Sequence, residues 1–182
     1  GGQLSFTGEE DLTLKLNNFK LNDLNTNLLG LPPEKSIDGE LNLDFVMTGT
    51  AEKPVMNLTY SVDSIKMQNL YLGSIESEFQ YSEKMLNVDL SFLETKNNQS
   101  RNSFGIKGTL PIDLAFYSEE RLPTGKTVDM TLVADNFDLR FASGFIPGIK
   151  NLNGQLNGDI NFSGPYNDLE NSGELTISNS SL

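Results

Sequence analysis

Apolar and polar residues alternate along most of the chain, and this pattern predicts β-strands with one apolar side. In the stretch 39–49, polar residues take one phase, with a single exception, and four apolar residues take the other: Leu41, Leu43, Phe45 and Met47. Successive side chains of a strand point to opposite faces of a sheet. Each such strand therefore presents an apolar face and a polar face.

The same alternation recurs often enough to predict about a dozen strands in an all-β fold of mostly antiparallel pairing. At most one or two short helices are expected, near 21–29, where leucines fall at helical spacing, and near 140–145. Polar stretches at 94–102 and 117–126 predict loops. We expect the strand that reaches Pro111 to bend there and to continue in phase through Ile112, Leu114 and Phe116.

Part of the pattern occurs twice, with an echo between residues 12–62 and 130–177. The segment 12–21 parallels 130–139 at an offset of 118, and Asp38-Gly39 parallels Asn153-Gly154 at an offset of 115. An internal repeat of strands indicates a stacked architecture. We therefore expect residues 1–182 to form a single segment of a longer repeat protein.

The apolar face of these strands has to be covered, and the sequence leaves two ways open. A sandwich would cover it with a second sheet, as in a closed surface adhesin. A single curled sheet would instead leave a groove, and a long exposed apolar surface usually marks a binding site. The groove lining expected from the apolar phase is Leu41, Leu43, Phe45, Met47, Leu58, Leu86, Val88, Leu90, Ile106, Leu132, Leu156, Ile160 and Phe162.

Composition removes several classes of function. Lys plus Arg is 13 and Asp plus Glu is 25, so the net charge of −12 disfavours binding to nucleic acid and to anionic membrane surfaces. The chain has no Cys and no His, which excludes disulfides, thiol chemistry, zinc sites built from Cys or His, and Ser-His-Asp catalysis. The carboxylates lie in the polar phase of strands, so we expect no enzyme activity, no metal site and no cofactor.

Several short motifs follow one another along the chain. They are Gly39-x-Leu-x-Leu, Gly49-Thr-x-x-x-Pro54, Leu72-Gly-Ser-Ile75, Gly108-Thr-Leu-Pro-Ile112, Ile149-x-x-Leu-x-Gly154-x-Leu-x-Gly158, Gly164-Pro165 and Gly173-Glu-Leu175. Their order resembles the TamB family of Gram-negative bacteria, which belongs with the AsmA-like, bridge-type lipid transport proteins. The resemblance covers most of the chain, and its second copy departs from the family's Gly-Thr-x-x-x-Pro turn at Gly164-Pro165-Tyr166.

The resemblance implies a fold, a location and partners. The fold is a long curled sheet that forms a hydrophobic groove, the β-taco. The location is the periplasm, in a protein anchored in the inner membrane. The partners are phospholipid acyl chains and an outer-membrane barrel protein of the TamA/BamA type, and the family implies no catalytic residues.

Three functions stay open from the sequence. The first is a lipid conduit that carries acyl chains in the groove and supports outer-membrane biogenesis. The second is a chaperone-like factor for assembly of outer-membrane proteins such as autotransporters, which would offer its groove or its strand edges by β-augmentation. The third is the closed sandwich adhesin. Unpaired edges also predict self-association through strands near 4–16 or 175–182.

Overall fold

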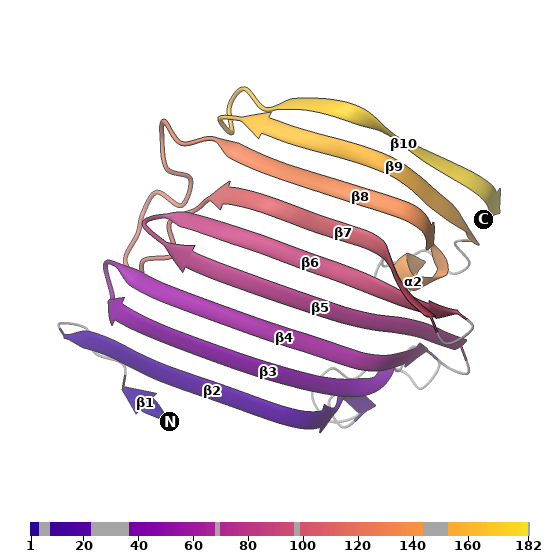
Figure 1. Cartoon of the computed structure of the whole chain (residues 1–182). Coiled ribbons are helices and arrows are strands. Elements are labelled where there is room, and N and C mark those ends of the chain that lie inside the picture. The colour runs from indigo at the N-terminus through magenta and orange to yellow at the C-terminus, as the bar shows by residue number, and fades with distance from the viewer. Residues whose placement is uncertain (4–7, 23–36, 68–69, 97–98, 144–152, 182) are drawn as a thin grey trace.

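The structure is a computed structural model, and it describes residues 1–3, 8–22, 37–67, 70–96, 99–143 and 153–181 (Figure 1). These residues form one antiparallel sheet whose ten strands follow each other in chain order. The strands are β1 (Gly2–Gln3), β2 (Glu9–Lys20), β3 (Ile37–Thr50), β4 (Pro54–Met67), β5 (Leu70–Ser82), β6 (Met85–Lys96), β7 (Gln99–Pro111), β8 (Val128–Asp138), β9 (Asn153–Gly164) and β10 (Glu170–Ser181).

This architecture confirms the all-β, mostly antiparallel fold expected from the alternation. The sheet is open, because β1 and β10 lie at opposite edges (Figure 1). The sandwich alternative is wrong for the described residues, which contain no second sheet. One short helix, α2 (Arg140–Ser143), matches the second expected helix. Leu21 and Asn22 are helical too, and the rest of the first expected helix lies outside the described residues.

The pairing register brings the apolar phase of the strands from β2 to β10 onto one side of the sheet, which we call the apolar face. Leu43 lies opposite Leu16 on one side and Tyr60 on the other. The row continues across the sheet through Ser77, Leu90, Ile106, Leu132 and Ile160. Apolar residues two positions apart on each strand build parallel rows in the same way, so the sequence pattern alone sets which side is apolar.

A line of β-bulges crosses the sheet near one end of the strands. The register shifts between Leu16 and Phe19 in β2, between Val62 and Ile65 in β4, and between Ala134 and Phe137 in β8. A bulge inserts one residue and bends the strand. In each pair the two apolar residues are three positions apart, which in a regular strand would place them on opposite faces. Because the bulge inserts one extra residue, both side chains point to the apolar face.

The bulges also repeat along the chain with the offsets of the sequence echo. Asn18 and Asn136, which are 118 residues apart, have φ of 50° each. Ser64 and Asn179, which are 115 apart, have φ of 54° and 52°. Positive φ is uncommon outside glycine. The corresponding strands therefore share backbone irregularities as well as side-chain pattern.

The bulged end of the apolar face holds the main core. Phe92 and Phe137 meet edge to face with ring centroids 5.3 Å apart, and Phe141 of α2 lies 4.4 Å from Phe92. Val62, Ile65, Leu72, Ala134 and Leu139 are buried in the same cluster. The helix α2 thus covers this end of the apolar face.

The other end is bordered by the segment 112–127, which we call the strap. The expectation that the strand continues past Pro111 is wrong, because β7 ends there. Three backbone amides tie the strap to the sheet, from Ile112 to Lys84 O, from Leu114 to Tyr81 Oη and from Phe116 to Ala51 O, at 2.8–3.0 Å. In Figure 1 the strap runs past the ends of β5 and β6 at the left.

Asp113 fixes the conformation of the strap. Its side chain is buried and accepts hydrogen bonds from Lys84 Nζ at 2.9 Å, from the Ala115 amide at 3.0 Å and from Ser118 Oγ at 2.8 Å. The hydrogen bond from Lys84, with that from Ala115, lowers the pKa of Asp113 to about 2. The carboxylate therefore stays ionised in neutral and mildly acidic solution. The expected loop over 117–126 is confirmed as a segment without strands.

The expected polar loop over 94–102 is wrong, since both arms of this stretch belong to strands. Thr95 pairs with Ser100, and β6 runs to Lys96. The stretch is polar because it lies beyond the last apolar row and forms an ion-pair network instead. Arg101 bridges Glu94 on β6, at 3.5 Å, and Asp135 on β8, at 2.9 Å.

Candidate functional site: an apolar trough

All thirteen residues expected to line a groove lie on the apolar face. Twelve of them are half-buried, and Met47, which is 3% exposed, is the exception. They come from six strands, β3, β4, β6, β7, β8 and β9, and pairing brings them into rows across the sheet. That these residues bind lipid stays a prediction.

Exposure divides the apolar face into covered ends and an accessible middle. At the bulged end Val62, Phe92 and Ala134 are buried, and at the strap end Met47 and Tyr81 are buried. The two rows between them, which we call the trough, are half-buried or exposed at every described position except Ser77, which is buried. The large side chains of the trough are Leu14, Leu16, Leu43, Phe45, Leu58, Tyr60, Phe79, Val88, Leu90, Ile106, Met130, Leu132, Ile160 and Phe162.

The trough runs across the strands and reaches both edges of the sheet. Neighbouring strands lie about 4.8 Å apart, so the nine strands from β2 to β10 give it a length of roughly 40 Å. Its last large side chain toward one edge is Leu14, which is 49% exposed. At the other edge the two rows end on β10 at Gly173 and Asn171. The apolar residues of that strand, Leu175 and Ile177, lie in the rows toward the bulged end, at 37% and 54% exposure. An elongated ligand could therefore lie along the rows.

The trough offers little for directed hydrogen bonding. Its one serine, Ser77, is 6% exposed, and its Oγ has no hydrogen-bond partner. A binding site for a polar substrate normally contains several well-placed donors and acceptors. A surface of Leu, Ile, Val, Met and aromatic side chains is instead suited to aliphatic chains.

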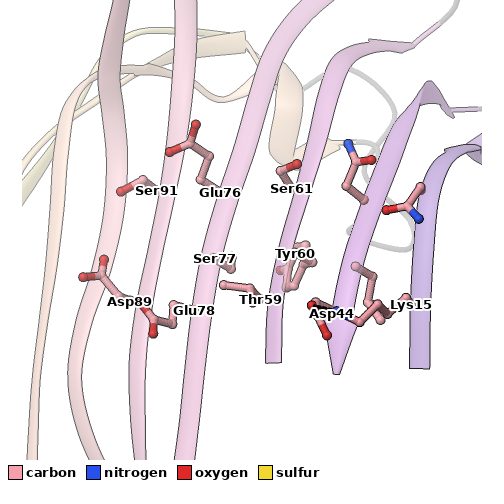
Figure 2. A pocket seen from close by; sticks show the side chains of 13 residues that line it. Lys15, Asp44, Thr59, Tyr60, Ser61, Glu76, Ser77, Glu78, Asp89 and Ser91 are labelled. Atoms are coloured by element: carbon pink, nitrogen blue, oxygen red, sulfur yellow. Dashed lines mark hydrogen bonds and ion pairs between the residues drawn. The ribbon is translucent and has the colours of Figure 1, made fainter. Parts of the chain in front are cut away.

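The opposite face is polar and carries a shallow hollow of about 640 Å³ over β2 to β6 (Figure 2). Hydroxyl and carboxylate side chains line it, among them Thr59, Glu76 and Glu78. Figure 2 shows Lys15 and Asp44 side by side, and their ion pair measures 2.6 Å. Such exposed pairs contribute about 0–1 kcal/mol, so we regard this face as a solvated surface.

Two further observations concern the described residues alone. They contain no group of three or more Asp or Glu side chains placed to hold a metal ion. None of their helices is both long and apolar enough to span a membrane.

The fold and the trough together define a class of protein: a single long antiparallel sheet with one continuous apolar face and no second sheet against it in the described residues. The comparison with known families agrees, since the model of the family described as TamB, N-terminal domain, matches residues 3–177. The chain therefore belongs to the TamB family, a family of membrane-associated bacterial proteins. No curated protein and no solved structure matches it.

Proposed function

We propose that this chain is a segment of a periplasmic bridge between the inner and outer membranes, and that its trough conducts phospholipid acyl chains. The observation that carries the proposal is the half-buried trough, which crosses the sheet from β2 to β10 without a charged side chain among its members. Family membership supports the proposal, since the resemblance to bridge-type lipid transport proteins implies the same activity. The inner-membrane anchor and the periplasmic location are part of the proposal.

Energetics favour an acyl chain as the ligand. Burial of one methylene contributes about 0.8 kcal/mol, so a chain of about 16 carbons offers on the order of 10 kcal/mol before ordering costs. The contribution does not depend on direction along the rows, because the hydrophobic effect is non-directional. A chain could therefore slide from strand to strand without losing a specific hydrogen bond.

A second candidate is the assembly factor for outer-membrane proteins, acting with a barrel protein of the TamA/BamA type. The observation that favours it is the outer edge of β10, which pairs with no other strand of the described residues. Strand edges can bind an incoming strand by β-augmentation. This candidate needs an accessible edge, whereas the conduit needs an accessible face.

The conduit is tested by extracting the purified chain with organic solvent and identifying bound lipid by mass spectrometry. We expect diacyl phospholipid to co-purify in an amount comparable to the protein. A matched sample of the chain with Ile160→Arg, which places a charge in the trough, should carry much less. Protein free of lipid after expression and after incubation with phospholipid would contradict the proposal.

A further inference from the structure

Ser77 is the one buried position of the trough, and its hydroxyl is unpaired. Ser77 is 6% exposed, and its Oγ has no hydrogen-bond partner. A buried polar atom without a partner destabilises a protein, and the large majority of such atoms in known structures are paired. A hydrogen-bonding group from outside the described residues would therefore stabilise this position.

The position needs a small side chain, but packing does not explain why that side chain carries a hydroxyl. Four larger residues flank Ser77 on the apolar face. Ile75 and Phe79 lie two positions away on β5, and Tyr60 and Leu90 lie directly opposite on the neighbouring strands. An alanine would leave them the same room without an unpaired polar atom. The hydroxyl is thus the feature that remains to be explained.

Two glycines in the same rows have a backbone reason that Ser77 lacks. Gly108 and Gly173 have φ of 146° and 111°, and a Cβ there would lie 2.0 and 2.3 Å from a backbone oxygen. These conformations and close contacts require glycine. Ser77 is not among the residues with positive φ, so its backbone does not dictate its residue type.

Tyr60 adds a second unpaired hydroxyl at the neighbouring position. It lies directly opposite Ser77 on β4 (Figure 2), is half-buried, and forms no side-chain hydrogen bond within the described residues. Directly opposite residues of antiparallel strands have Cβ atoms about 4.5–5.5 Å apart. Among the described residues of the two rows these are the only hydroxyl groups, and each can donate a hydrogen bond.

We propose that Ser77 and Tyr60 bind the ester groups of a diacyl glycerolipid, at the point where its acyl chains begin. Such a lipid carries two ester carbonyls, which accept hydrogen bonds, beside two aliphatic chains, which match the rest of the rows. Ser77 Oγ donates to one carbonyl and Tyr60 Oη to the other. An ester is uncharged, so it enters an apolar surface at a lower cost than a carboxylate does.

The site has one conformational requirement and one consequence for transport. The ring of Tyr60 lies parallel to that of Phe79, with centroids 6.1 Å apart, and it has to turn aside before a carbonyl reaches Ser77. Acyl chains slide along the apolar rows without directed contacts, whereas the ester end is held at β4 and β5. The inference rests on the proposed function, because it requires that the trough binds lipid.

A competition between two lipids tests the proposal. The complete chain is incubated with vesicles that contain equal amounts of a diester phosphatidylcholine and its diether analogue with the same hydrocarbon chains. The diether keeps the head group and the chains but lacks both carbonyls. After the protein is re-isolated, mass spectrometry gives the ratio of the two bound lipids. We expect about fivefold more diester than diether, a ratio that corresponds to about 1 kcal/mol, the net contribution of one hydrogen bond.

Variants that remove single hydroxyls show whether these two residues cause the preference. Ser77→Ala and Tyr60→Phe should each lower the ratio, and the double variant should retain both lipids equally, with as much diether as the wild-type chain. The control is Ser61→Ala, which removes a hydroxyl next to Tyr60 on the polar face and should keep the fivefold preference. Urea unfolding should show no loss of stability in Ser77→Ala, because Oγ has no partner in the protein.

The outcomes separate the ester site from the conduit. Equal retention of the two lipids by the wild-type chain would overturn the ester site and leave the conduit standing. A preference for the diester that survives in the double variant, or a clear loss of stability in Ser77→Ala, would also overturn it, since the hydroxyls would then serve another purpose. Retention of neither lipid would contradict both proposals.

Discussion

The variant Phe45→Arg is expected to remain folded and to lose most of its bound lipid. Phe45 is half-buried in the trough, so a guanidinium at this position can reach water along its flexible stem. The loss of stability should be modest, about 1–2 kcal/mol, from the apolar area removed. The charge would stand in the path of an acyl chain, and burying it against hydrocarbon would cost several kcal/mol. Circular dichroism, urea unfolding and mass spectrometry of extracted lipid measure these effects.

Met47→Arg is the matched control, because Met47 lies two residues further along β3 on the same face. It is 3% exposed at the strap end. An arginine there would bury an unpaired charge, and we expect a loss of several kcal/mol, a large share of a typical stability of 5–15 kcal/mol. If the two variants are destabilised equally, the trough is closed, and the conduit has lost its structural basis.

Phe92→Ala is expected to cause the largest loss of stability of any single truncation on the apolar face. Phe92 is 2% exposed and contacts Phe137 and Phe141. Removal of a buried phenyl ring typically costs 3–5 kcal/mol, from lost transfer energy and from the cavity that remains. The loss should also weaken the packing of α2 on the sheet. Urea unfolding gives the free energy, and hydrogen exchange at residues 137–141 reports on the packing.

Leu14→Ala provides the comparison for this prediction. Leu14 has the same apolar phase but is 49% exposed at the sheet edge, so its truncation should cost less than about 1 kcal/mol. A similar cost at both positions would show that the aromatic cluster is not the centre of the core.

The side of each strand that is apolar could be predicted from the sequence because it depends only on the period of two. The pairing register then brought the predicted lining residues into rows, since each strand pairs with its neighbour in the chain. The covered ends could not be predicted in this way. Met47 has the same phase as Phe45, and only the position of the strap distinguishes their exposure.

The bulges left a signal in the sequence that the search for strict alternation missed. The apolar residues Leu16 and Phe19 are three apart, as are Val62 and Ile65, and Ala134 and Phe137. A change of spacing from two to three inside an alternating run marks an inserted residue. The loop predicted over 94–102 was wrong for a different reason. There the strands continue to pair although their side chains are polar, and Arg101 forms ion pairs with two of these strands' neighbouring carboxylates, Glu94 and Asp135. Loop prediction from polarity alone fails at such strand ends.

The measurement that tests the central claim most directly is methyl NMR of the chain with a phospholipid that carries a nitroxide on its acyl chain. The nitroxide broadens signals of nearby methyl groups. We expect broadening of Leu43, Leu90 and Leu132 in the trough, with Val46, Val55 and Val133 on the polar face unaffected. Equal broadening on both faces, or broadening of the polar-face valines alone, would contradict the assignment of the trough as the lipid-binding surface.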